Sequence, residues 1–139
     1  MKKIIFFGDS ITDMGRNRDD DSSFGVGYPS VIVKRVYEKY DNQYLILNRG
    51  ISGDRIVDLY ARIKKDVWNL KPDYLFILIG VNDVWHEIDF GNGVDINRFE
   101  KVYRMLIEDT LNVLKDSKIA LFEPFILKGG ATIATMMSL

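Results

Sequence analysis

Cysteine is absent from the 139-residue sequence, and histidine occurs only once, at His86. The lack of cysteine excludes thiolate nucleophiles and cysteine-ligated metals, and it is consistent with a cytoplasmic protein, the location that we expect. A single histidine also excludes a metal site built from several histidines. We therefore expect no metal site in this chain.

Charge of one sign and long apolar runs are also lacking. Nineteen basic and twenty acidic side chains give a net charge of -1, so no overall field favours nucleic acid or an anionic membrane. No run is long enough to cross a bilayer, and the apolar stretch that begins at Ile4 is interrupted at Gly8, too early for a signal peptide. We expect a small or neutral molecule as partner, with no nucleic acid and no membrane.

Apolar residues are plentiful, at 47% of the chain, which is sufficient for the core of one domain. Short apolar runs predict strands that alternate with segments of helical periodicity. This alternation predicts an α/β fold with a parallel sheet and helices on both faces. The expected strands are 4–7, 44–47, 74–79 and 119–122, and the expected helices are 29–40, 54–69 and one from an Asn97 cap to about Leu114.

The tripeptide Gly8-Asp9-Ser10 directly follows the first predicted strand, whose composition suits burial on both faces. Ligands of open α/β sheets bind at the carboxyl ends of the strands, where the loops converge. Ser10 is therefore our candidate nucleophile. Taken alone, the tripeptide is also compatible with a plain turn in which Ser10 caps a helix.

Two further predicted strands end in polar loops that contain glycine, Gly50-Ile51-Ser52-Gly53-Asp54 and Gly80-Val81-Asn82-Asp83. An esterase needs a hydroxyl to attack a carbonyl carbon and several N–H donors around the oxygen that becomes negative. Ser10 can supply the hydroxyl. The backbone N–H groups of Ser10 and Gly53 and the side-chain amide of Asn82 can supply the donors.

The polar, glycine-rich stretch 13–27 is predicted to be a long loop beside the nucleophile, where it could bring Arg16 and Arg18 to the rim of a substrate site. Its charges also fit a solvated surface loop. We assign Asp9, Arg16 and Trp85 to substrate contact. The alternatives are that Asp9 only stabilises its turn and that Trp85 only packs.

The three glycine-containing blocks, in their order and spacing, resemble the GDSL or SGNH family of serine esterases and acylhydrolases. Gly8-Asp9-Ser10 matches the nucleophile block of that family, Ile51-Ser52-Gly53-Asp54 its glycine block and Gly80-Val81-Asn82-Asp83 its asparagine block. The similarity extends from about Lys3 to Phe125. It is strongest to the branch that contains bacterial carbohydrate acetyl esterases.

This resemblance implies a three-layer α/β/α fold with a flavodoxin-like parallel sheet. It also implies ester hydrolysis through an acyl-serine intermediate and without a cofactor. The implied substrate is a small ester, with acetylated carbohydrate as a candidate. Residues 1–125 would form the family domain, and residues 126–139 an atypical C-terminal tail.

The family's fourth block, an Asp-x-x-His that supplies the general base and its orienting carboxylate, is not found after Phe125. We therefore interpret the domain as C-terminally truncated. Asp83 and His86 have the same spacing, but Asp83 belongs to the asparagine block. His86 is retained as a candidate base, although a rim or surface position fits it better.

Two consequences follow from the missing block. Without a base, attack by Ser10 is expected to be slow, so the alternative to an esterase is a non-catalytic remnant that binds a sugar or acyl ligand. The fourth strand would also have an uncovered edge, through which we expect the chain to self-associate. A phosphate or nucleotide binder is disfavoured because no glycine-rich phosphate loop is present.

Overall fold

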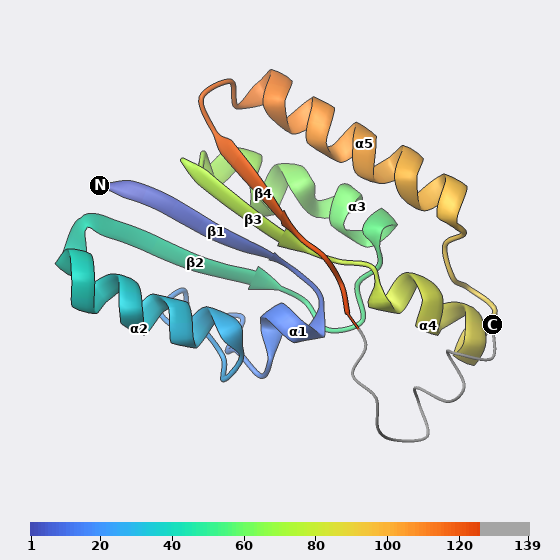
Figure 1. Ribbon diagram of the computed structural model, residues 1–139, viewed down its shortest axis with the longest axis horizontal. Helices are drawn as coiled ribbons and strands as arrows, with labels where there is room; N and C mark the ends of the chain where they lie inside the picture. Colours follow the sequence, from blue (N-terminus) through green and yellow to red (C-terminus); the bar gives the residue numbers. More distant parts are fainter. Residues whose placement is uncertain (126–139) are drawn as a thin grey trace.

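The computed structural model describes residues 1–125, which form an alternating series of strands and helices (Figure 1). The predicted tail, 126–139, lies outside the described residues. The elements are β1 (Lys2–Gly8), α1 (Ser10–Asp13), α2 (Tyr28–Tyr40), β2 (Tyr44–Gly50), α3 (Ile56–Asp66), β3 (Tyr74–Leu78), α4 (Val81–Phe90), α5 (Ile96–Val113) and β4 (Lys118–Phe122), with short 3-10 turns at Asp41–Gln43 and Trp68–Leu70.

The four strands form one parallel sheet in the order β2-β1-β3-β4. β1 lies inside the sheet, with β2 on one side and β3 on the other. The predicted α/β fold with a flavodoxin-like parallel sheet is confirmed. Each crossover between strands carries a helix, as parallel pairing requires.

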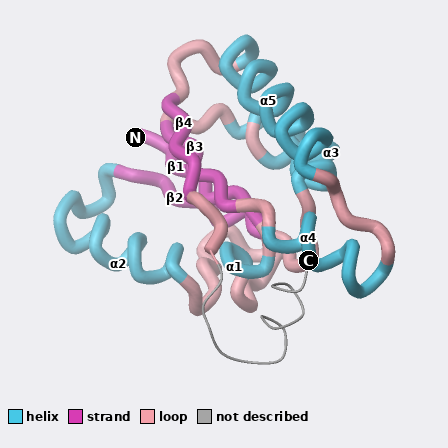
Figure 2. The backbone as a smooth tube through the Cα atoms, turned by 45° about the vertical axis from the view of Figure 1, so that its right-hand side comes forward, coloured by secondary structure: helices cyan, strands magenta, loops and turns pink. Residues whose placement is uncertain are grey.

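Helices cover both faces of the sheet, with α2 on one side and α3 and α5 on the other (Figures 1 and 2). Alternate residues of β1 supply the two cores: Ile5 and Phe7 pack on the α3 side, and Ile4 and Phe6 pack on the α2 side. All four are buried, as expected for a strand covered on both faces. Among residues 1–125, no helix has the length and hydropathy needed to cross a bilayer.

Helix α4 is absent from the sequence prediction, which left this segment irregular. Its start offers no Ser, Thr, Asp or Asn cap, because Gly80 precedes it with a φ of 137° and no side-chain cap forms. Helix α3 begins at Ile56, two residues later than predicted. These errors matter for function, because Asn82, Trp85 and His86 all lie on α4.

The predicted Asn97 cap of α5 is wrong. The helix begins at Ile96, and the Asp95 side chain accepts a hydrogen bond from the Arg98 N–H at 3.0 Å. Both residues are suitable cap types, and only the backbone geometry distinguishes them. Asp95 has the extended φ and ψ that a cap requires.

Replacing Asp95 with alanine is expected to lower the free energy of unfolding by about 1 kcal/mol, because the Arg98 N–H loses its acceptor. Asn97→Ala is the matched control, since Asn97 is exposed within the first turn and is expected to change stability by less than about 0.5 kcal/mol. Urea unfolding followed by circular dichroism measures both. A larger loss for Asn97→Ala would restore the original cap assignment.

Candidate active site

The carboxyl ends of three neighbouring strands are aligned at one edge of the sheet. Gly8 of β1 lies opposite Gly50 of β2 and opposite Leu78 of β3. The Ile51 N–H donates to the Gly8 carbonyl oxygen at 3.0 Å, which joins the loop after β2 to the end of β1. The loops that carry the three sequence blocks therefore leave the sheet side by side.

The nucleophile loop is held at both ends of α1. The Asp9 side chain caps the helix by accepting from the Ile11 N–H at 3.0 Å, and Thr12 shares a 2.7 Å hydrogen bond with the Tyr28 hydroxyl of α2. Ser10 is the first residue of α1 and is partly exposed.

Close packing requires glycine at position 8. A Cβ on Gly8 would lie 2.4 Å from the Leu78 carbonyl oxygen and 2.5 Å from the Thr12 hydroxyl oxygen. The first of these atoms is backbone and cannot rotate away. Any larger residue would push α1 away from the end of β3, and Ser10 with it.

Asp9 is buried, with 1% of its surface exposed, and its second carboxylate oxygen has no hydrogen-bond partner among the described residues. Burial raises the pKa of Asp9 to about 6, against the hydrogen bond from the Ile11 N–H, which favours the charged form. The structure therefore places Asp9 beneath Ser10 as a helix cap. A direct contact between Asp9 and substrate stays a prediction.

The glycine loop is tied to the nucleophile loop by the buried carboxylate of Asp13. Ser52 donates to it twice, from its backbone N–H at 3.0 Å and its hydroxyl at 3.1 Å, and Arg18 donates at 2.8 Å. Burial opposes ionisation of Asp13, but the hydrogen bonds from Arg18 and Ser52 outweigh it and lower the pKa. Gly53 follows in an exposed position with a φ of 89°, which favours glycine.

Asn82 joins the asparagine block to the glycine loop. It lies in the first turn of α4, and its side-chain amide donates to the Asp54 carbonyl oxygen at 3.1 Å. The neighbouring Asp83 carboxylate accepts from the Ile56 N–H at 3.0 Å, which fixes α4 against the start of α3. Burial is the main cause that raises the pKa of Asp83 to about 6.

The remaining predicted site residues have defined contacts elsewhere. Arg16 donates from Nε to the Gly50 carbonyl oxygen at 2.8 Å, so its side chain braces the end of β2. Trp85 donates to Asp89 one turn along α4. His86 packs edge-on against the Phe90 ring, 5.4 Å between centroids, one helical turn after Asn82. Substrate contact by Arg16 and Trp85 stays a prediction.

The sequence analysis did not predict the role of three residues that organise the loops: Asp13, Asp83 and Arg62. Their side chains bond to backbone groups or side chains of other loops, far away in the chain. The one available signal was Arg62, a charged residue next to the buried Ile63 and three after the buried Leu59. A charge beside the apolar face of a helix indicates a specific partner.

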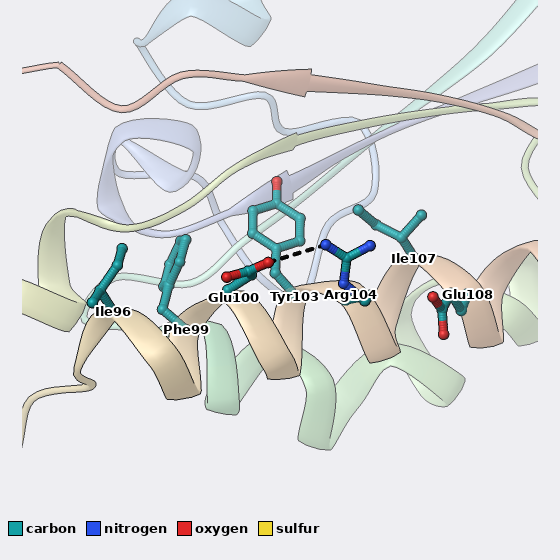
Figure 3. A pocket seen from close by; sticks show the side chains of 7 residues that line it. All are labelled: Ile96, Phe99, Glu100, Tyr103, Arg104, Ile107 and Glu108. Atoms are coloured by element: carbon teal, nitrogen blue, oxygen red, sulfur yellow. Dashed lines mark hydrogen bonds and ion pairs between the residues drawn. The ribbon is translucent and has the colours of Figure 1, made fainter.

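A groove of about 440 Å³ lies along α5. Figure 3 shows its side chains rising from α5, with Tyr103 pointing toward the sheet. It is lined by Ile96, Phe99, Glu100, Tyr103, Arg104, Ile107 and Glu108. None of the predicted catalytic residues borders it.

Comparison with known proteins identifies the family. The model of the GDSL-like lipase/acylhydrolase family matches residues 6–136. The chain belongs to this family. The recognition made from the three blocks is thereby confirmed.

Individual GDSL-like relatives include esterases. An acetylxylan esterase from Geobacillus stearothermophilus is 37% identical over 137 residues, covering 92% of this chain and 62% of the relative. The crystal structure of an acetylxylan esterase from that organism, Axe2, has a TM-score of 0.84 at 34% identity and covers 99% of this chain and 67% of Axe2.

A second solved structure, described as a GDSL-like lipase from Parabacteroides merdae, has a TM-score of 0.89 at 40% identity. The match covers 94% of this chain and 62% of that protein. The chain therefore spans roughly two thirds of the length of its GDSL-like relatives. Structures of Axe2 include catalytic mutants in which a serine, an aspartate or a histidine is replaced by alanine.

Asp83→Asn is expected to change how stability depends on pH. Because the pKa of Asp83 is about 6 in the folded protein and 3.8 ordinarily, the folded state binds the proton more tightly. The stability due to this group is therefore complete below about pH 4 and is lost as the pH rises through 6. The neutral amide removes this loss, so the variant should gain about 2 to 3 kcal/mol relative to wild type between pH 4 and 7.

Urea unfolding at several pH values measures this difference. Asp116→Asn, at an exposed position, is the control and should follow wild type across the range. A constant difference between Asp83→Asn and wild type from pH 4 to 7 would contradict the raised pKa.

Proposed function

We propose that residues 1–125 carry the nucleophile and the oxyanion donors of a serine ester hydrolase. The observation that supports this is the joining of the three block loops at the aligned strand ends. Ile51 donates to the Gly8 oxygen, Ser52 to Asp13 and Asn82 to the Asp54 oxygen. Ser10, Gly53 and Asn82 each lie within two residues of one of these bonds.

In the proposed reaction, the Ser10 hydroxyl oxygen attacks the ester carbonyl and the carbonyl oxygen becomes negative. The backbone N–H groups of Ser10 and Gly53 donate to this oxygen, and so does the Asn82 amide. An amide NH2 has two donors, and one of them binds the Asp54 oxygen. That bond orients Asn82 and leaves its second N–H for the substrate. Because no side chain is assigned as base, solvent water takes the Ser10 hydroxyl proton and gives a proton to the alcohol as it leaves. Water then hydrolyses the acyl-serine that results.

An ester of a small acid is the proposed substrate, and an acetylated carbohydrate is the proposed class. The acetylxylan esterase relatives support this choice. Trp85 and Arg16, from α4 and the loop after α1, are proposed to border the sugar. No cofactor takes part in the proposed chemistry.

The proposed site has a nucleophile and oxyanion donors, but no residue is assigned to it as general base. In Axe2 the mutated catalytic aspartate and histidine are three positions apart. The Asp83 and His86 pair has this spacing, but Asp83 is buried and bonded to Ile56. We propose that His86 is not the base. Loss of the base costs a serine hydrolase about 10^6 in turnover, while oxyanion donors and binding retain about 10^3 over water.

Ser10→Ala tests this proposal. The purified chain is expected to hydrolyse p-nitrophenyl acetate slowly, about 10^3 above the uncatalysed rate at most. Ser10→Ala should lower this rate, because it removes the acyl-serine path and leaves only attack by water on an ester held by the oxyanion donors. His86→Ala is the matched control and should keep the wild-type rate. Equal rates for wild type and Ser10→Ala would refute hydrolysis by Ser10, and a loss in His86→Ala would identify His86 as the base.

The second candidate function is a remnant that binds a sugar or acyl ligand without turnover. The same joined loops favour it, because backbone donors bind an ester carbonyl whether or not a base is present. Calorimetric titration with an acetylated xylo-oligosaccharide separates the two functions. Binding without release of acetate would support the remnant.

We also propose that the chain self-associates through β4. Among residues 1–125, β4 pairs with β3 alone, and Leu121 is 49% exposed. Two copies related by a two-fold axis pair identical strands antiparallel. Centred between Ala120 and Leu121, this pairing places Lys118 of each copy opposite Glu123 of the other, so the edge is complementary to itself in charge.

Leu121→Lys is expected to convert a two-chain species into single chains, because it places like charges near each other at the centre of the pairing. Light scattering coupled to gel filtration measures the mass. Val31→Lys, an exposed position on α2, is the control and should leave the mass unchanged. A stable single chain for wild type at high concentration would contradict the pairing.

A further inference from the structure

Arg62 of α3 contacts the ends of two strands and the glycine loop, although it belongs to none of the three blocks. Its side chain is 14% exposed, and its guanidinium carbon lies 4.4 Å from the centre of the Phe7 ring. Its hydrogen bonds go to Asp54 from Nε at 2.7 Å, to the Arg49 oxygen and Asp66 from Nη1 at 2.8 and 2.9 Å, and to the Gly8 oxygen from Nη2 at 3.1 Å.

These partners lie at the base of the proposed site. Gly8 precedes the nucleophile by two residues, and Asp54 follows Gly53 directly. The Gly8 oxygen also accepts from the Ile51 N–H. This one carbonyl therefore accepts hydrogen bonds both from the start of the glycine loop and from Arg62. Arg62 thereby connects the nucleophile loop to the loop that carries the proposed oxyanion donor.

The connection depends on the shape of guanidinium. Arginine has five N–H donors in a rigid plane, and this plane can stack on an aromatic ring while its edges bond in several directions. A lysine at position 62 would keep the charge near Asp54 but could not stack on Phe7 and also reach both strand ends. The Asp54 carboxyl is partly buried, and Arg62 favours its charged form against the burial that raises its pKa.

We propose that Arg62 is a positioning residue of the esterase site, which sets the separation between Ser10 and the Gly53 N–H by holding Gly8 and Asp54 on one guanidinium. This inference rests on the proposed function for its catalytic part. Arg62 touches neither substrate nor reacting atoms. Its effect reaches the reaction through the two loops, where a displacement of about 1 Å can cost about a hundredfold in rate.

Arg62→Lys in the full chain is the test, with Arg104→Lys as the matched control. Arg104 is an exposed arginine on α5 whose side chain bonds to Glu100 at 3.0 Å. The first measurement is hydrogen exchange by mass spectrometry. In Arg62→Lys, segments 8–13 and 50–55 should exchange about tenfold faster, while β3 should keep its wild-type protection.

The second measurement is the hydrolysis of p-nitrophenyl acetate. In Arg62→Lys, kcat should fall about 10- to 100-fold while KM stays within about twofold, because the loops still bind the ester but hold the attacking and stabilising groups out of register. Arg104→Lys should match wild type in both measurements.

The outcomes distinguish this inference from the proposed function. Unchanged exchange in both loops, equal acceleration throughout the chain, or an unchanged kcat where the wild type shows turnover that depends on Ser10, would overturn the positioning role. Local acceleration in a chain whose wild type shows no turnover that depends on Ser10 would support the loop connection and refute the proposed hydrolysis.

Discussion

Gly8 lies between two neighbouring strands, and its carbonyl oxygen accepts hydrogen bonds from Ile51 and from Arg62. Parallel pairing brings the carboxyl ends of all strands to one edge, and the register places Gly8 level with Gly50 and Leu78. The meeting of the three loops therefore follows from the sheet itself. Close packing at Gly8 then fixes the position of α1, because this helix lies directly against the end of β3.

Hydrogen bonds with polar side chains hold these loops in place. Glycine-rich segments have few side chains to bury, so hydrogen bonds to buried polar side chains stabilise them instead. The Asp13 carboxylate accepts from Ser52, and the Asp83 carboxylate accepts from the Ile56 N–H. The Asn48 side chain donates to the Thr12 oxygen at 2.7 Å and accepts from the Gly50 N–H.

These buried carboxyls also make stability depend on pH. Burial raises the pKa of Asp9 and Asp83 to about 6, so these carboxyls favour the folded state more when protonated. The two carboxyls that fix the loops therefore lower the stability of the folded protein at neutral pH.

The sequence was sufficient to predict the strands, the sheet and the three blocks, because these features depend on local apolar runs and on glycine at strand ends. It was insufficient for α4, which begins after Gly80 without a cap, and for the choice between Asp95 and Asn97. The sequence did not predict the contacts of Asp13, Asp83 and Arg62 either, for another reason. Each has a partner 27 to 54 residues away, Ser52 for Asp13, Ile56 for Asp83 and Gly8 for Arg62, and only the fold brings these pairs together.

The oxyanion donors and the general base of the proposed chemistry depend on different features of the chain. Two of the proposed donors are backbone N–H groups of strand-end loops, and the third, Asn82, is oriented by a backbone oxygen. Such donors persist as long as the register and the loops persist. A general base is a single side chain that must reach Ser10, and His86 is the one histidine of the sequence, on α4 against Phe90. In the proposed site, binding of a carbonyl oxygen therefore depends on the strand register and the loops, whereas turnover depends in addition on one side chain that can take the Ser10 proton.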